Sequence, residues 1–255
     1  MKIFEFSVFL ISVLSIIISI HLAKKGNVPR IRKIICLEAL DELVGRAAEM
    51  GKPVHIATGM SKLESAEAPI VAAGLAMLGH VAYLCGKYKV PMRYTCVYGY
   101  NIPIAQDLIK SGYTRGGHPE LYSDDLIFYA GDHQQSYSAA MMGYIMRERP
   151  AANMMFGGIK YETLNVLGAG AVAGAMQAAG TPRLYYQPFL VASCDYSMIG
   201  DELFAAAAVV SGIPDELGAI RGQDIIKFIA TILVIISVIL ASSGLGSLFL
   251  KLIGM

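Results

Sequence analysis

The stretch Pro53-Val54-His55-Ile56-Ala57-Thr58-Gly59 decides the fold, because it is a short apolar run that ends in a turn. A run of this length before a glycine is typical of a strand that is buried on both faces. A helix is expected after it, since Ser65 and Glu67 are typical of a helix start and apolar residues continue to Lys87. A buried strand followed by a long helix is the repeating unit of parallel α/β sheets.

The same unit recurs along the chain. Further strands are predicted at 92–98, 125–130, 152–156 and 184–192. Helices are predicted before the first strand and after the later ones, at 37–50, 102–111, 136–149, 162–179 and 199–210. Five strands alternating with helices predict an α/β, Rossmann-like domain, with a parallel sheet of about five strands and helices on both faces. Residues 112–124 are predicted to be a long loop, and 211–223 a linker.

An apolar run flanks this domain at each end of the chain. The first carries no charged side chain from Phe6 to Ala23 apart from a possible charge on His21, and the second carries none from Phe228 to Leu250. About 20 apolar residues cross a bilayer core of about 30 Å, so 3–23 and 225–252 are predicted to be transmembrane helices. A cleaved signal peptide is the alternative for the first run, although no small-residue cleavage site precedes its end.

Basic residues lie on the inner side of both runs. Arg221 and Lys227 precede the second run, and the first is followed by Lys24, Lys25, Arg30, Arg32 and Lys33. The positive-inside rule therefore predicts a cell-membrane protein whose central domain, 30–222, is cytoplasmic, with membrane lipids among its partners. The formal net charge of only +1 and the lack of a basic stripe predict no nucleic-acid partner.

Ligands of open parallel sheets bind beyond the carboxyl ends of the strands, so a site is sought in the turns after the predicted strands. These turns hold nine candidate ligand-binding residues: Thr58, Gly59, Asn101, Asp132, His133, Gln134, Gly157, Gly158 and Asp195. Asp132 and His133 offer an acid and a base, although such a pair alone has no specificity as a motif. The alternative interpretation is that Asn101, Asp132 and Asp195 cap the helices that follow them.

No motif in the chain predicts a catalytic residue, a cofactor or a metal site. The glycines of Gly168-Ala-Gly170-Ala-Val-Ala-Gly174 approximate a dinucleotide fingerprint with Asp195 as the acidic partner, but the third glycine is one place late. The alternative is a small-residue helix that packs closely against its neighbours. The four scattered cysteines predict buried thiols rather than a zinc site, and His55 is expected to be a core residue.

Several motifs carry a family resemblance. They include Gly131-Asp132-His133-Gln134, Ala152-Asn153-Met154-Met155 and Cys194-Asp195-Tyr196, and the similarity covers most of 30–225. With these motifs the chain resembles a prokaryotic, membrane-anchored family that carries a domain of unknown function. The resemblance implies an anchored domain and transfers no catalytic residue.

These features predict a non-enzymatic assembly or scaffold protein, whose domain associates with copies of itself or docks a partner complex. One alternative is a nucleotide or small-metabolite sensor, or an enzyme, that uses the strand-end turns. A second is an accessory subunit that anchors an enzyme complex. A patch of small residues at 242–247 is expected to let anchor helices pair.

Overall fold

The structure is a computed structural model that describes residues 3–243, and it divides into two compact units. One unit is helical and contains the terminal segments up to residue 31 and from residue 212. The other, residues 32–211, is an α/β domain.

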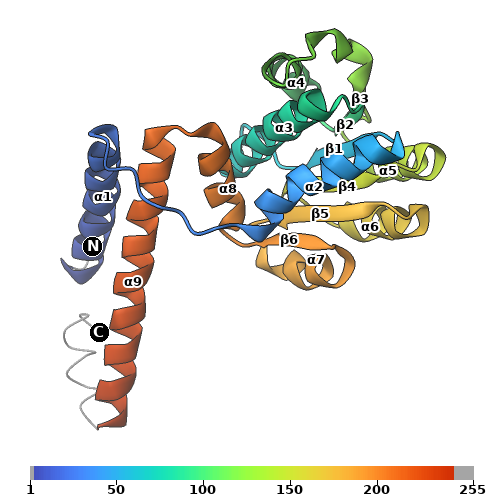
Figure 1. The fold of residues 1–255 in the computed structure, drawn as a ribbon. Coiled ribbons are helices and arrows are strands. Elements are labelled where there is room, and N and C mark those ends of the chain that lie inside the picture. The colour runs from blue at the N-terminus through green and yellow to red at the C-terminus, as the bar shows by residue number, and fades with distance from the viewer. Residues whose placement is uncertain (1–2, 244–255) are drawn as a thin grey trace. The chain divides into compact units, whose positions relative to one another are not determined.

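The α/β domain contains a parallel six-stranded sheet in the order β3-β2-β1-β4-β5-β6 (Figure 1). The strands are β1 (Val54–Gly59), β2 (Met92–Cys96), β3 (Ile127–Tyr129), β4 (Ala152–Gly158), β5 (Met176–Thr181) and β6 (Tyr196–Ile199). This is the strand order of doubly wound, dinucleotide-binding sheets. The predicted Rossmann-like α/β class is therefore confirmed, with one strand more than the five that were outlined.

Helices cover both faces of the sheet. One layer consists of α2 (Ile35–Met50), α3 (Ala68–Tyr88), α4 (Ile102–Arg115) and α8 (Glu202–Ser211). The other consists of α5 (Gln134–Glu148), α6 (Glu162–Ala173) and α7 (Gln187–Ser193). Single 3-10 turns complete the connections, at η1 (Gly99–Asn101), η2 (Pro119–Leu121), η3 (Asp124–Leu126) and η4 (Leu184–Tyr186).

Local sequence accounts for the central elements. All six residues of β1 are buried, as expected for a strand between two helical layers. In α2 the buried positions recur at helical spacing, and Gly51 ends the helix in the left-handed conformation that glycine adopts at little cost. Pro69 lies in the first turn of α3, where its missing N–H removes no intrahelical hydrogen bond.

The third quarter of the chain differs from the prediction. The helix predicted at 162–179 ends at Ala173, and its last part is β5. The strand predicted at 184–192 is wrong, because this segment forms η4 and α7 with Pro188 in the first turn of α7. The helix predicted from residue 199 begins at Glu202, after β6.

The two predicted connections are also more ordered than expected. Helix α4 continues to Arg115, and η2 occupies part of the predicted 112–124 loop. The predicted linker at 211–223 belongs mostly to α9 (Pro214–Ser242), which begins with a proline and is continuous.

In the helical unit, α1 (Ile3–Lys24) packs antiparallel to α9. Gly218 and Gly222 allow the contact, since a Cβ at either position would stand 2.7 Å from a Cα of α1, that of Ile20 or Ile16. Lys24 Nζ and Asp215 Oδ2 form an ion pair at 2.9 Å. The pairing therefore uses these glycines; the small-residue patch predicted at 242–247 lies outside the described residues from position 244 onward.

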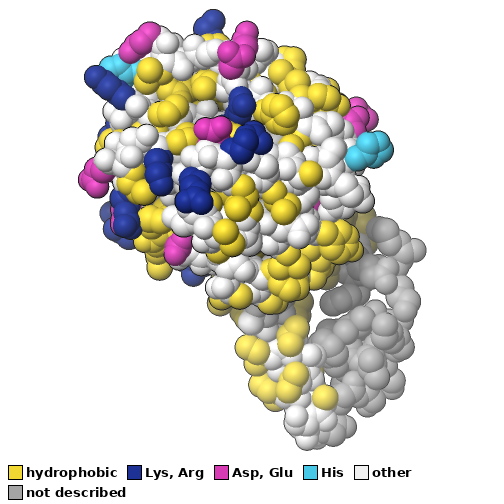
Figure 2. Space-filling model, turned by 90° about the vertical axis from the view of Figure 1, so that its right-hand side faces the viewer, with side chains coloured by type: hydrophobic (Ala, Val, Ile, Leu, Met, Phe, Trp, Pro, Cys, Tyr) yellow, Lys and Arg dark blue, Asp and Glu magenta, His cyan; other side chains and the backbone are white. Residues whose placement is uncertain are grey.

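Three described helices are long and apolar enough to span a membrane: α1 from Phe6, α3 and α9. Over half of the apolar window of α3 is buried inside the domain, whereas that of α1 is 11% and that of α9 is 0% buried. On the face drawn in Figure 2, the lower part of α9 presents only hydrophobic and uncharged side chains, while charges of both signs are scattered over the α/β domain. The predicted span at 225–252 is described only up to residue 243.

A row of buried polar side chains crosses the sheet, and we call it the polar ladder: Thr95, His55, Asn153 and Gln177. The register places His55 of β1 opposite Asn153 of β4, and Asn153 opposite Gln177 of β5. His55 Nδ1 lies 2.8 Å from Asn153 Oδ1, and Asn153 Nδ2 donates to Gln177 Oε1 at 3.1 Å. The row ends at the carbonyl of Ser193, which accepts from Gln177 Nε2 at 3.0 Å. The four neighbouring strands β2, β1, β4 and β5 thus contribute one polar side chain each, and each side chain has a hydrogen-bond partner.

Gly170 of α6 lies directly over the polar ladder. A Cβ at this position would stand 2.2 Å from Gln177 Oε1 and 3.1 Å from Asn153 Nδ2. The glycine therefore lets α6 approach the sheet without displacing the amides. Two residues earlier on the same helix, Gly168 is exposed, and a Cβ there would meet nothing within 4 Å.

These two glycines provide a matched test of the ladder. We expect Gly170→Ala to destabilise the fold by about 1–3 kcal/mol, because the methyl group forces Gln177 away from its partners. The thermal midpoint should fall by about 3–10 °C in a circular dichroism melt of the full chain in detergent. Gly168→Ala should leave the midpoint unchanged or raise it, since alanine favours a helix by about 1 kcal/mol over glycine. Equal effects of the two changes would contradict the packing of α6 on the ladder.

Candidate functional site

The carboxyl ends of β1 and β4 meet at the point where the strand order reverses, which is where doubly wound sheets bind their ligands. Gly59 pairs with Gly158 there, at an irregularity in the register. A Cβ on Gly59 would stand 2.5 Å from the carbonyl carbon of Gly158, and one on Gly157 would stand 2.5 Å from the carbonyl oxygen of Thr58. Three of the predicted site glycines thus bring two strand ends into direct backbone contact.

Arg183, in the turn after β5, ties the neighbouring loops together. Its Nη1 donates to the carbonyl of Ile159 at 2.9 Å, and its Nη2 donates to Ser61 Oγ at 3.3 Å and pairs with Glu67. Burial acts to raise the pKa of Glu67, but hydrogen bonds from Arg183 and Ser61 hold it below the usual value. The Arg183 side chain is only 9% exposed. The loops after β1, β4 and β5 are therefore held by one guanidinium.

A carboxylate that is fully buried, unlike the half-exposed Glu67, lies at the start of α6. Glu162 accepts from the backbone N–H of Lys160 at 2.9 Å and from Gln134 Nε2 at 2.8 Å. Gln134 is the first residue of α5, so this contact joins the helices that follow β3 and β4. Of the predicted candidates, Gln134, Thr58 and the three glycines thus lie around the same strand ends.

Tyrosine hydroxyl groups occupy the inner side of this edge. Tyr94 and Thr58 share a hydrogen bond of 2.8 Å, and Tyr137 accepts from the N–H of Gly59 at 3.3 Å. Burial raises the pKa of Tyr94 and of Tyr137 well above the usual value, so both remain neutral. These rings fill the space below the strand ends.

Three predicted candidates lie at the same edge but apart from this network. Asn101 is buried in η1, and its Oδ1 has no hydrogen-bond partner among the described residues. Asp132 is exposed and accepts from the Tyr129 hydroxyl at 2.6 Å. His133 occupies the cap position of α5 without a side-chain capping bond. Among the described residues, the Asp132 and His133 side chains share no hydrogen bond or ion pair.

Asp195 lies at the opposite edge of the sheet. It stands before β6, and its Oδ2 accepts from the backbone N–H of Gln177, near the start of β5, at 2.7 Å. Because the strand predicted at 184–192 is helical, Asp195 follows α7 and not a strand. Neither Asn101 nor Asp195 makes the side-chain helix cap that the alternative interpretation predicted.

The glycine run 168–174 does not form a turn between a strand and a helix. Gly168 and Gly170 lie inside α6, and Gly174 ends that helix in the left-handed conformation. The interpretation of this run as a small-residue helix that packs closely is therefore confirmed, and the dinucleotide fingerprint is wrong.

Metal-binding side chains do not gather within residues 3–243, where no group of three or more His, Cys, Asp or Glu could hold an ion. Cys36, Cys85 and Cys96 are buried free thiols, and Cys194 is half-buried.

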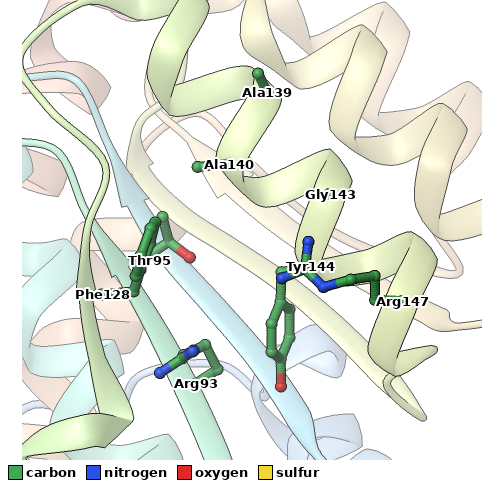
Figure 3. Close-up of a pocket in the computed structure, with 8 residues that line it drawn as sticks. All are labelled: Arg93, Thr95, Phe128, Ala139, Ala140, Gly143, Tyr144 and Arg147. Atoms are coloured by element: carbon green, nitrogen blue, oxygen red, sulfur yellow. The ribbon is translucent and has the colours of Figure 1, made fainter.

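A pocket of about 120 Å³ opens on the side of the sheet, between β2, β3 and α5 (Figure 3). Arg93, Thr95 and Phe128 line it from the strands. Helix α5 contributes the remaining lining residues, which are Ala139, Ala140, Gly143, Tyr144 and Arg147. None of these residues was among the predicted candidates, because three of them lie inside strands and the helical ones belong to no motif. The alternation of side chains along β2 could have indicated the pocket, because it places Arg93 and Thr95 on the same face of the sheet.

The polar ladder ends at this pocket. Thr95, which is 1% exposed, lies 3.0 Å from His55 Nε2 through its hydroxyl oxygen. Burial lowers the pKa of His55 to about 4, while its contact with Asn153 acts to raise it. The imidazole is therefore neutral at pH 7. Because Asn153 presents its oxygen to Nδ1, the proton is on Nδ1, and Nε2 accepts from the Thr95 hydroxyl.

The buried imidazole predicts a loss of stability in mild acid. The pKa of His55 is about 4 in the folded chain and 6.5 in the unfolded chain. Between these two values the unfolded chain binds a proton at His55, whereas the folded chain keeps this imidazole neutral. Stability is complete above pH 6.5 and falls as the pH drops toward 4. We expect a loss of about 2 kcal/mol between pH 7.5 and pH 5, measured as a lower thermal midpoint.

His55→Gln is the control for this effect. Its midpoint should be lower at pH 7.5 but should change less between the two pH values, because glutamine does not titrate. The pKa of half-buried His80 is also lowered by burial, and the comparison subtracts its contribution, which both proteins share. An equal pH dependence of the two proteins would remove His55 as the cause.

The comparisons with known proteins place the chain in a family. No curated protein and no solved structure matches it. A family model described as a domain of unknown function (DUF6754) matches residues 1–251. This match covers both the α/β domain and the described parts of the terminal helices, so the chain belongs to the DUF6754 family of unknown function.

Proposed function

We propose that this chain is a membrane-anchored assembly protein whose α/β domain associates with a second copy of itself. The observation that carries the proposal is an exposed tyrosine surface at the carboxyl ends of β4 and β5. We define this surface by Tyr161, Leu164, Leu184, Tyr185 and Tyr186. It supports a docking role because tyrosine and leucine exposed together are typical of protein interfaces.

Most of the tyrosine surface is open to solvent. Tyr161, Leu184 and Tyr185 are 74%, 73% and 67% exposed. Tyr186 lies beneath them and joins them, since its ring centroid lies 6.0 Å from that of Tyr161 and 4.8 Å from that of Tyr185. Tyrosines offer large contact areas and lose little side-chain entropy when they are buried. Such a surface is more stable when a partner covers it.

Two properties of the chain favour a second copy as the partner. The 21 basic and 20 acidic residues nearly cancel, so two copies do not repel each other strongly. Anchoring in a membrane confines the copies to a plane and raises their effective concentration. A docked partner complex, or an enzyme for which the chain is the anchor, is the alternative occupant of the same surface.

The anchors are α1 and α9, whose exposed apolar side chains support a lipid environment. The basic residues that follow α1 and precede Phe228 support a cytoplasmic α/β domain in the cell membrane, as the positive-inside rule requires. A prokaryotic origin, which the family resemblance implies, fits this arrangement.

The register of the helix pair adds a constraint. Ile16 and Ile20 of α1 pack beside Gly222 and Gly218, which precede the uncharged run of α9 from Phe228. The charged side chains of α9, the last of which is Lys227, therefore lie at the level of the second half of α1. A charged side chain costs about 2.5–3.5 kcal/mol at the centre of a bilayer. In this pairing, the first half of α1 lies deepest in lipid, beside the start of the uncharged run.

Cysteine labelling tests the anchors and the side of the membrane. In a background with the four native cysteines replaced, we expect Ser237→Cys to resist a maleimide reagent, because lipid covers it. Val172→Cys, at an exposed position of α6, should react with an impermeant maleimide only after the cells are opened. Ser19→Cys, at a position that is only 2% exposed, should also resist the reagent if the helix pairing persists in the membrane. Labelling of Val172→Cys in intact cells would contradict the cytoplasmic placement.

Removal of the tyrosine surface should weaken self-association. We expect the double change Tyr161→Ser and Tyr185→Ser to raise the dissociation constant of the dimer at least about tenfold, since central aromatic residues dominate interface energies. Sedimentation equilibrium of the full chain in detergent measures this. Val172→Ser is the matched control, because Val172 is 72% exposed and lies at the other end of α6.

Three outcomes distinguish a second copy of the chain from a different protein as the partner that covers the tyrosine surface. A dimer that the double change dissociates, while Val172→Ser leaves it intact, supports the proposal. A dimer that both variants retain would place the interface elsewhere. A monomer at every concentration would reject self-association and leave a different protein as the partner.

A further inference from the structure

The pocket between β2, β3 and α5 is a concentration of positive charge in a chain that is nearly neutral. Arg93 enters it from the strand side and Arg147 from the helix side (Figure 3). None of the eight lining residues is acidic. Two guanidinium groups that share a small pocket repel each other, so an anion between them would relieve the repulsion.

Arg93 is held in place before any ligand arrives. Its guanidinium carbon lies 5.5 Å from the ring centroid of Phe128 and 5.5 Å from that of Tyr144. One of its nitrogens donates to the backbone carbonyl of Asp125. A guanidinium fixed between two rings loses little entropy on binding, and its remaining N–H groups are available for a ligand.

Arg147 has no hydrogen bond or ion pair within the described part of the chain. Its side chain folds back along α5, so that its Nη1 would lie 3.3 Å from a Cβ on Gly143. The absence of a side chain at Gly143 thus leaves room for the guanidinium beside the pocket. Arginine donors are planar and forked, a geometry that matches two oxygens of a phosphate or carboxylate group.

Thr95 distinguishes among the possible anions. Its hydroxyl proton is donated to His55 Nε2, because the polar ladder sets the direction of every hydrogen bond from Thr95 to Ser193. Toward the pocket the Thr95 oxygen therefore presents only lone pairs. A fully ionised sulfate or carboxylate would be repelled by these lone pairs, whereas an oxyanion that keeps one O–H can donate to them.

We propose that this pocket binds a protonated phosphate group, between the guanidinium groups of Arg93 and Arg147 and with its P–OH donating to Thr95. The pocket of about 120 Å³ has room for a group of this size, given that one water occupies about 30 Å³ of liquid. The phosphate could be free inorganic phosphate or the end group of a monoester. The site lies on α5 and β2, apart from the tyrosine surface, so it is independent of the proposed self-association.

Calorimetric titration of the full chain in detergent tests this site, with inorganic phosphate, methyl phosphate and sulfate as probes at equal ionic strength. We expect phosphate to bind and to raise the thermal midpoint, and sulfate to bind at least about tenfold more weakly. The titrations are run near pH 6, where a large share of methyl phosphate still carries its P–OH. Methyl phosphate that binds as tightly as inorganic phosphate then indicates a monoester ligand, and weaker methyl phosphate binding indicates free phosphate. Both results support the site. The absence of phosphate binding would overturn it.

Variants of the two sides of the pocket make the test specific. Arg147→Gln, an exposed change, should weaken phosphate binding about ten- to a hundredfold, because it removes a charge-assisted pair of hydrogen bonds. Arg46→Gln is the matched control, since Arg46 is an exposed arginine of α2 that lies outside the pocket. Retention of full affinity by Arg147→Gln, or an equal loss in Arg46→Gln, would reject the site.

The role of Thr95 has its own test. Thr95→Val should abolish the preference for phosphate over sulfate, while Thr95→Ser, which keeps the hydroxyl, should retain it. Because Thr95→Val also removes a partner of His55, its thermal midpoint must show a folded protein at the temperature of the titration. A preference that Thr95→Val retains, or equal binding of sulfate by the unchanged chain, would overturn the selection of a protonated oxygen.

Discussion

The hydrogen bonds that run in one direction across the buried side of the sheet constrain the rest of the α/β domain. Amide and imidazole groups are costly to bury without partners, and each group of the polar ladder can be satisfied only by its neighbour on the next strand. A slip of one residue in any of these strands would turn its polar side chain to the other face. The ladder therefore specifies the register of four strands and requires a neutral His55.

A second constraint acts where β1 and β4 end. In doubly wound sheets this position usually opens to a ligand, but here Gly59 and Gly158 touch and Arg183 closes the loops above them. The strand order alone therefore does not indicate a nucleotide site in this chain. Two arginine side chains instead share the pocket beside β2 and α5, where the ladder reaches Thr95.

The sequence was sufficient for the strands that are mostly apolar. β1, β2 and β4 contain runs of β-branched, aromatic or methionine residues, and all three were predicted close to their observed bounds. β5 was missed because Met176–Thr181 is rich in alanine and glycine and continues the composition of α6. Without β5, the sequence gives no reason to place Arg183 at a strand end. The ladder was equally hidden, because register between distant strands is a tertiary property that no local pattern encodes.

Hydropathy alone does not separate the exposed candidate spans from the one that is buried inside the domain. α3 is apolar around most of its circumference, and the sheet, α4, α8 and α2 cover it. α1 and α9 are as apolar or more so, yet among the described residues they cover each other only along one side, and Phe9, Ile17 and Phe228 remain more than half exposed. A helix that is hydrophobic all round must be buried in protein or in lipid. Burial inside the domain accounts for the apolar surface of α3, whereas the exposed apolar side chains of α1 and α9 make these two helices candidate membrane spans.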